Sequence, residues 1–259
     1  MGAHSISVLG YSESVASTLI TKSGSTTPHK AATCSTVARK ILMSLTGLCL
    51  ILFLLMHVFG NLKLLVPDSG AEFDEYSHAL RTFLYPILPE KFFLWCFRLF
   101  LLACAVIHIL FAVQLTFRNF TGGNRVKYLK TRYLEGSFAA RTMIWSGIII
   151  FLAFIFHLLQ FTTQTIRINY PAGEMNIAPH LRVVNAFQQP WMVIFYAIFV
   201  GLVCFHIWHG FSSAFTTLGL RLGATSSKVI HACAWIVALA LFVGFMLTPI
   251  LIATGVIFS

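Results

Sequence analysis

Four histidines lie in the middle of four long apolar stretches of the sequence. They are His57, His108, His157 and His206. An ionisable side chain at membrane depth is costly, so such a residue usually marks a functional site. One histidine in each of four stretches is the arrangement expected for two pairs of axial imidazole ligands. We therefore interpret the four as clamping two hemes b between membrane helices, with electron transfer as the expected chemistry.

The composition indicates an integral membrane protein. Of the 259 residues, 58% are hydrophobic and only 10% are charged, whereas soluble domains contain about 25% charged residues. The formal net charge is +10 at pH 7. It does not indicate nucleic-acid binding, because the basic residues flank apolar stretches and form no soluble face. The six cysteines show no CxxC spacing, so neither a disulfide framework nor c-type heme attachment is expected.

Five apolar stretches are long enough to cross a bilayer as helices, for which about 20 residues are needed. They lie near residues 38–60, 91–118, 141–166, 190–218 and 228–256. We predict an all-α membrane domain of five transmembrane helices over residues 37–259. Residues 1–36 are rich in Ser and Thr and lack the apolar core of a signal peptide. This segment is expected to be a polar, partly disordered tail.

The distribution of Lys and Arg predicts the orientation of the helices. Most of these residues lie in the N-terminal tail and in the second and fourth loops. The positive-inside rule therefore places the N-terminus in the cytoplasm and the C-terminus outside. No Asp or Glu falls within any of the five stretches. We expect a multi-pass protein of the cytoplasmic membrane of a prokaryote.

Depth along the helices decides which histidines can pair. A helix rises about 1.5 Å per residue, which places His57 and His157 about 27 and 24 Å from the basic flanks that open their helices. By the same measure, His108 and His206 lie only about 15 and 18 Å from the cytoplasmic side. We therefore expect His57 and His157 to hold an outer heme, and His108 and His206 to hold an inner heme.

Several polar residues are candidates for the surroundings of the hemes. His209 follows His206 by three residues on nearly the same helix face, so it is an alternative ligand or a neighbour of a propionate. Arg98 either snorkels or pairs with a propionate of the outer heme. Arg141 and Ser44 are similar candidates at the inner heme. Quinone contacts are weakly marked, and the candidates near the outer heme are Asn61, Lys63, Glu75 and His78.

The sequence around the histidines resembles the diheme cytochrome b subunit of succinate:quinone oxidoreductases. The runs that carry the resemblance are Leu45–Leu48 with His57–Leu62, Arg141–Gly147 before His157, and Phe187–Trp191 with His206–Phe211. They are similar to the first, third and fourth helices of that family, in the same order. The likeness extends from about Lys40 to the C-terminus.

The resemblance implies a membrane anchor of succinate dehydrogenase or fumarate reductase, with its axial ligands at the four histidines named above. Its partners would be a flavoprotein with FAD and an iron–sulfur protein, both docked on the cytoplasmic side, and a higher oligomer of the complex is compatible with this. Electrons would pass from the iron–sulfur clusters through the two hemes to a membrane quinone, expected to be menaquinone. Cys204 stands where some fumarate-reducing members carry a carboxylate proposed to conduct protons, which speaks against a proton path of that kind.

Three other classes of protein remain as alternatives. A standalone diheme b-type cytochrome reductase would use the same histidine pairs without peripheral subunits. A transporter with proton-relaying histidines would bind no chromophore, and the lack of acids within the spans argues against it. A heme-free anchor would tolerate the loss of any one histidine without a spectral change.

Overall fold

The computed structural model describes residues 35–121, 138–174 and 176–258. The chain divides into two units, Met1–Ala38 and Arg39–Ser259. The predicted tail therefore lies almost wholly outside the described residues, as does the basic part of the second loop. Of the described residues, 78% are helical and none lies in a strand. This confirms the predicted all-α class.

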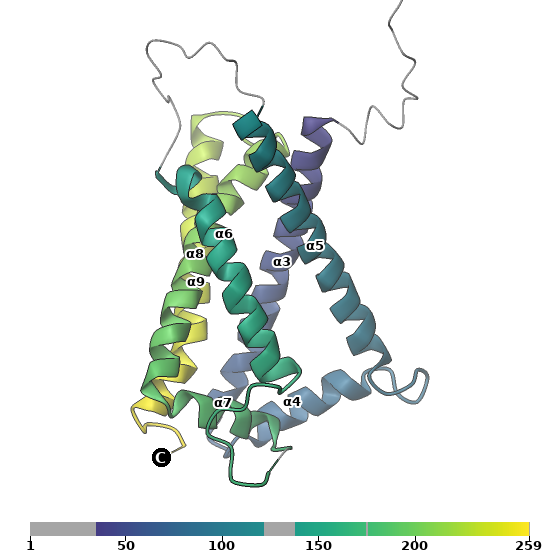
Figure 1. Ribbon diagram of the computed structural model, residues 1–259, viewed down its shortest axis with the longest axis vertical. Coiled ribbons are helices and arrows are strands. Elements are labelled where there is room, and N and C mark those ends of the chain that lie inside the picture. The colour runs from purple at the N-terminus through teal and green to yellow at the C-terminus, as the bar shows by residue number, and fades with distance from the viewer. Residues whose placement is uncertain (1–34, 122–137, 175, 259) are drawn as a thin grey trace, which may run out of the picture. The chain divides into compact units, whose positions relative to one another are not determined.

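Within the part of the chain that the structure describes, five helices are long and apolar enough to cross a membrane, as predicted. They are α3 (Thr36–Leu62), α5 (Phe92–Thr121), α6 (Phe138–His157), α8 (Pro190–Thr217) and α9 (Ala224–Ala253), labelled in Figure 1. The third was predicted to run to residue 166. Instead, α6 ends at His157 and continues as a π-helical turn, η2 (Leu158–Thr162). Helix α8 begins at Pro190, where the missing backbone donor of proline costs nothing.

Two short helices, α4 (Ala71–Thr82) and α7 (Pro179–Phe187), lie in loops for which the sequence predicted no helix. The carboxylate of Asp74 in α4 accepts hydrogen bonds from both Nδ1 and the backbone N–H of His180 in α7, at 2.6 and 2.9 Å. Gly70, with φ of 90°, precedes α4, and a Cβ there would come within 2.6 Å of the His180 ring. These contacts join the two loop helices at one end of the spans.

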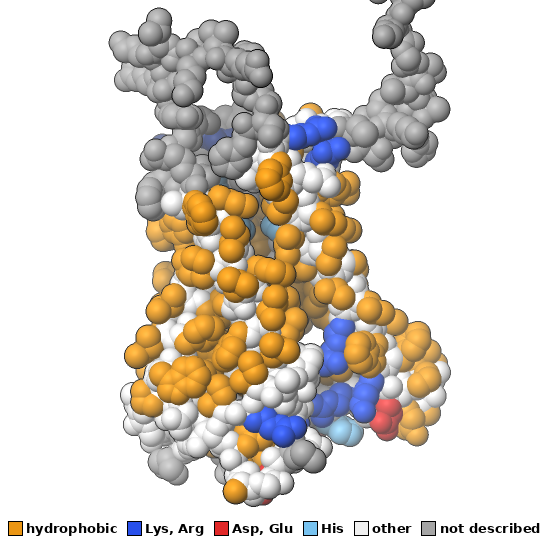
Figure 2. Space-filling model, in the orientation of Figure 1, with side chains coloured by type: hydrophobic (Ala, Val, Ile, Leu, Met, Phe, Trp, Pro, Cys, Tyr) orange, Lys and Arg blue, Asp and Glu red, His pale blue; other side chains and the backbone are white. Residues whose placement is uncertain are grey.

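The five spans are unequally packed within the chain. In the most apolar window of each helix, 39% of the residues of α9 and 28% of those of α8 are buried, against 6% for α3 and for α5. Helices α8 and α9 lie side by side, and α6 lies against α8 (Figure 1). Figure 2 shows hydrophobic side chains covering the middle of the visible face, with Lys and Arg nearer its ends. This is the distribution that lipid requires.

One close contact brings α3 to α9. A Cβ at Gly244 in α9 would lie 2.5 Å from Val58 of α3, so glycine is needed for the two backbones to approach this closely. Val58 follows His57 directly in the chain. The contact therefore fixes the part of α3 that carries one of the four histidines.

Candidate functional site

Two pairs of imidazole rings face each other between the helices. The ring centroids of His57 and His157 lie 6.1 Å apart, and those of His108 and His206 lie 6.4 Å apart. The first, here called the outer pair, joins α3 to α6, and the second, the inner pair, joins α5 to α8. Each ring thus lies beside the ring to which the depth argument assigned it. His206, and not His209, faces His108.

The spacing within each pair fits two imidazoles on opposite sides of one metal ion. A metal–imidazole bond is about 2.0 Å long, as for zinc, and the ring nitrogen lies about 1.1 Å from the ring centroid, so two such centroids would be about 6 Å apart. The observed distances are 6.1 and 6.4 Å. Within the described residues, no group of three or more His, Cys, Asp or Glu side chains could hold a metal. The candidate metal donors are therefore the two pairs of histidines.

The hydrogen bonds of the inner pair fix where its protons lie. His108 Nδ1 is 2.9 Å from the carbonyl oxygen of Met43, which can only accept, so this nitrogen carries the proton. His206 Nδ1 is 3.2 Å from Ser146 Oγ, and that hydroxyl donates its own proton to the Met143 carbonyl at 3.0 Å. His206 Nδ1 must therefore be the donor. Both rings keep the lone pair of Nε2 free for a metal.

The same hydrogen-bond argument assigns the proton on one ring of the outer pair. His157 Nδ1 is 3.2 Å from the hydroxyl of Tyr196, which donates to Gln160 Oε1 at 2.9 Å. His157 Nδ1 is therefore the donor, and its Nε2 is unprotonated. His57 stacks on Phe53 with centroids 5.3 Å apart. Metal-binding histidines almost always donate their second ring N–H to an oxygen acceptor, and three of these four rings do so.

Two glycines form a wall against the inner pair. A Cβ at Gly47 in α3 would lie 3.1 Å from Cε1 of His108, which is closer than ordinary contact allows. A Cβ at Gly147 in α6 would lie 3.7 Å from Cε1 of His206, an ordinary van der Waals distance. The room left by Gly47 is therefore taken by an imidazole ring.

The predicted neighbours of the hemes have varied surroundings. Ser44 is buried in α3, next to Met43, whose carbonyl binds His108. Arg98 is exposed on α5, with its guanidinium carbon 5.3 Å from the ring centroid of Trp95. His209 is half-buried on α8. The side chain of Arg141 lies outside the described residues.

The predicted quinone candidates are spread over α3, the 3-10 turn η1 (Lys63–Leu65) and α4, and they do not share one set of contacts. Asn61 donates to the backbone carbonyl of His57 on its own helix, at 2.8 Å. Lys63 forms an ion pair with Glu72. Glu75 and His78 are exposed on α4. A quinone site at these four residues stays a prediction.

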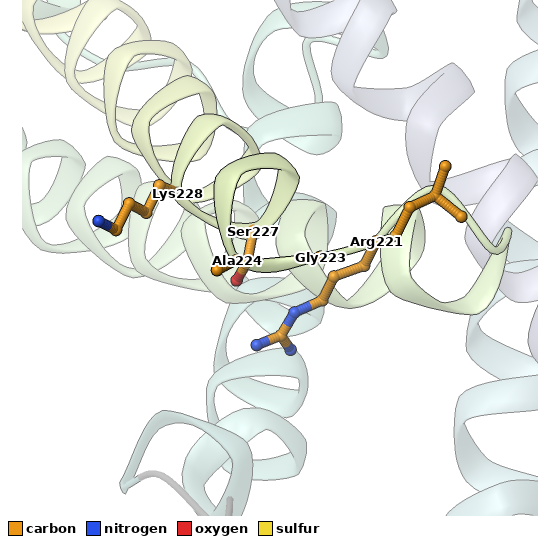
Figure 3. A pocket seen from close by; sticks show the side chains of 6 residues that line it. Arg221, Gly223, Ala224, Ser227 and Lys228 are labelled. Atoms are coloured by element: carbon orange, nitrogen blue, oxygen red, sulfur yellow. The ribbon is translucent and has the colours of Figure 1, made fainter.

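Two cavities lie away from the histidine pairs. One, of about 360 Å³, is an apolar groove between α8 and α9 that includes Trp208 and Trp235. The other, of about 570 Å³, lies at the turn between the same helices and is lined by Arg221, Ser227 and Lys228. Figure 3 shows these basic side chains around the first turn of α9. This second cavity puts two cations at one end of the spans.

Sequence reasoning did not identify the partners of the histidines. Tyr196 and Gln160 had a usable signal, since Tyr196 is the only tyrosine in the five spans and Gln160 follows His157 by three residues. Ser146 likewise precedes Gly147 in one of the runs that carry the resemblance. The Met43 carbonyl had no signal, because every residue carries a carbonyl.

The fold and the site together define a class: a multi-pass helical membrane protein in which facing histidine pairs lie at two levels between the spans. No family model, curated protein or solved structure matches the chain. The resemblance of the sequence runs therefore remains a basis for a proposal.

Proposed function

We propose that this chain is the membrane anchor and electron-transfer subunit of a succinate dehydrogenase or fumarate reductase. It passes electrons between an iron–sulfur subunit and a membrane quinone through two hemes b. The observation that carries the proposal is the pairing of four intramembrane imidazoles at centroid distances of 6.1 and 6.4 Å. Heme iron with two imidazole ligands changes oxidation state without changing ligands, which suits electron transfer.

The chain's own residues fit this cofactor. His57 and His157 would hold one heme, and His108 and His206 the other, each through Nε2. The Nδ1 hydrogen bonds to Met43, Ser146 and Tyr196 orient three of the four rings. Each site offers two protein donors, so a heme bound there would supply the remaining metal ligands and the redox chemistry. The apolar helices around the rings would keep bulk water away from a heme held there.

The partner subunits in this proposal carry the dicarboxylate chemistry, with FAD in one and iron–sulfur clusters in the other. They dock on the cytoplasmic side of a prokaryotic inner membrane. Among the described residues, Arg221 and Lys228 at the α8–α9 turn offer positive charge for this contact. The rest of the expected basic surface, residues 122–137, lies outside the described part of the chain.

A spectral experiment tests the proposal. The complex is purified in mild detergent, and the heme b per chain is measured from pyridine derivatives and reduced-minus-oxidised spectra. Two hemes per chain are expected. His108→Ala and His206→Ala should remove one spectral component, and His57→Ala and His157→Ala the other. His209→Ala serves as the control and should keep both.

Three results would contradict the proposal in whole or in part. A colourless complex would overturn the proposal, and loss of the same single component in all four variants would overturn the two-site assignment. Two hemes in a chain that purifies without a flavoprotein or an iron–sulfur protein would favour a standalone diheme cytochrome reductase.

A further inference from the structure

A buried amide next to the outer pair has a donor without a partner. Gln160 is only 3% exposed, and its Nε2 has less than 1 Å² of accessible surface and no hydrogen-bond partner. The oxygen of the same amide is satisfied, because it accepts from Tyr196 at 2.9 Å. A buried donor left unpaired is costly and uncommon in native proteins. The open N–H groups therefore point to an acceptor that the chain itself does not supply.

The backbone at Gln160 is specialised. Gln160 lies in the π-helical turn Leu158–Thr162, which directly follows His157. Such turns are rare and are found frequently at functional sites. Within this turn, the side-chain oxygen of Gln160 accepts the hydrogen bond from Tyr196. The irregular turn therefore carries the polar group that bonds to Tyr196.

The amide is connected to the histidine and enclosed by apolar residues. Tyr196 bonds both to His157 Nδ1 and to Gln160 Oε1. It belongs to a buried cluster with Phe187 and Met192. In such low-dielectric surroundings a satisfied hydrogen bond is strong and an unsatisfied group is expensive. The position of the spare donor is thereby fixed relative to the outer pair.

We propose that Gln160 Nε2 binds an oxygen atom of a small molecule held at the outer pair. The chemistry required is a carbonyl or carboxylate oxygen, which accepts from an amide N–H. Two ligands bring such an oxygen: a heme, through its carboxylates, and a quinone, through its ring carbonyl. The inference rests on the proposed function, because both ligands belong to it. Gln160 is the binding residue, and Tyr196 positions it.

Two substitutions isolate the donor. Gln160→Met keeps the length of the side chain and removes the amide. Gln160→Asn keeps the amide and withdraws it by one methylene group, and it serves if the Met variant does not fold. Gln114→Met is the matched control, because it makes the same exchange at an exposed glutamine of α5. All are made in the full complex with its partner subunits.

Two readouts separate the ligands. The negative charge of a heme carboxylate that loses its donor is less well compensated, which favours ferric iron, so the midpoint potential of the outer heme should fall while that of the inner heme stays constant. A tenfold change in relative stability corresponds to about 59 mV for one electron. If the ligand is a quinone, the KM for a short-chain naphthoquinone should rise about tenfold, with both potentials unchanged.

Either result supports a ligand-binding role for Gln160. The inference is overturned if both hemes are present in Gln160→Met or Gln160→Asn and neither the outer potential nor the quinone KM moves. A water molecule on the amide would then suffice. A shift of the same size in the control Gln114→Met would also overturn it. Failure of the proposed function looks different, since the unsubstituted protein would then contain no heme or would purify without the partner subunits.

Discussion

The hydrogen-bond acceptors of the imidazoles differ between the two levels, and this difference can be tested. Ser146 accepts from the inner pair and Tyr196 from the outer pair. Loss of such an acceptor typically lowers metal affinity about 10–100-fold. We expect Ser146→Ala to loosen the inner heme alone, and Tyr196→Phe to loosen the outer heme alone. Heme retention during dialysis against apomyoglobin, followed by difference spectra, measures this. Equal loss of both components in either variant would contradict it.

The two glycines of the inner wall provide a second, matched pair of substitutions. A Cβ at Gly47 would press on His108 at 3.1 Å, whereas one at Gly147 would meet His206 at 3.7 Å. Gly47→Ala should therefore displace an imidazole and lower the inner heme content, while Gly147→Ala should leave it near normal. Low-temperature electron paramagnetic resonance of the ferric hemes reports ligand geometry. Indistinguishable spectra for the two variants would count against the described contact.

At the scale of single residues, the sequence identifies the histidines that are costly to bury in a membrane, but it does not identify their hydrogen-bond partners. The four histidines stand out because an ionisable group in lipid is rare. Their pairing followed from helical rise alone, and the rings lie in those pairs. The acceptor on Met43 could not be predicted, since it depends on how closely α3 and α5 approach. The bond from Tyr196 to Gln160 depends on a π-helical turn that apolar periodicity does not reveal.

At the scale of the helices, the contact of α3 with α9 leads to a testable prediction. A side chain larger than hydrogen at Gly244 would overlap Val58, at 2.5 Å for Cβ alone. Overpacking of this kind costs about 1–3 kcal/mol. Gly244→Leu should lower the unfolding temperature and release the outer heme, because His57 precedes Val58. Gly201→Ala, whose Cβ would lie 3.9 Å from Phe242, is the control and should be mild. Thermal unfolding followed at the heme absorbance compares the two variants.

The spans were predictable, and the loop helices were not. Long apolar runs without acids specify membrane helices through length and composition alone. Helices α4 and α7 lie in segments marked by Pro67, Gly70 and Pro179, which read as turns. They are held by tertiary contacts such as that between Asp74 and His180. Sequence pattern carries little information about contacts between residues so far apart in the chain.

For the whole molecule, the proposed assembly with partner subunits predicts a role for the positive charge at the α8–α9 turn. We expect Arg221→Glu to weaken co-purification of the iron–sulfur subunit, and more strongly at low salt, since exposed charges are screened by ions. Arg167→Glu reverses an exposed charge near the opposite ends of the spans and should have no such effect. Pull-down yields across a range of salt concentrations provide the comparison. Equal losses in both variants would argue against docking at this turn.

In α3 and in α5, only 6% of the residues of the most apolar window are buried within the chain. This weak packing bears on the stability of newly synthesised protein in the cell. Two of the four histidines reside on these helices, so iron porphyrin would bridge segments that otherwise have little to hold them. Newly synthesised chains lacking porphyrin would be open to membrane proteases, and their abundance should follow porphyrin supply. In a porphyrin auxotroph, pulse-chase labelling should show a short half-life under starvation that lengthens when precursor is fed.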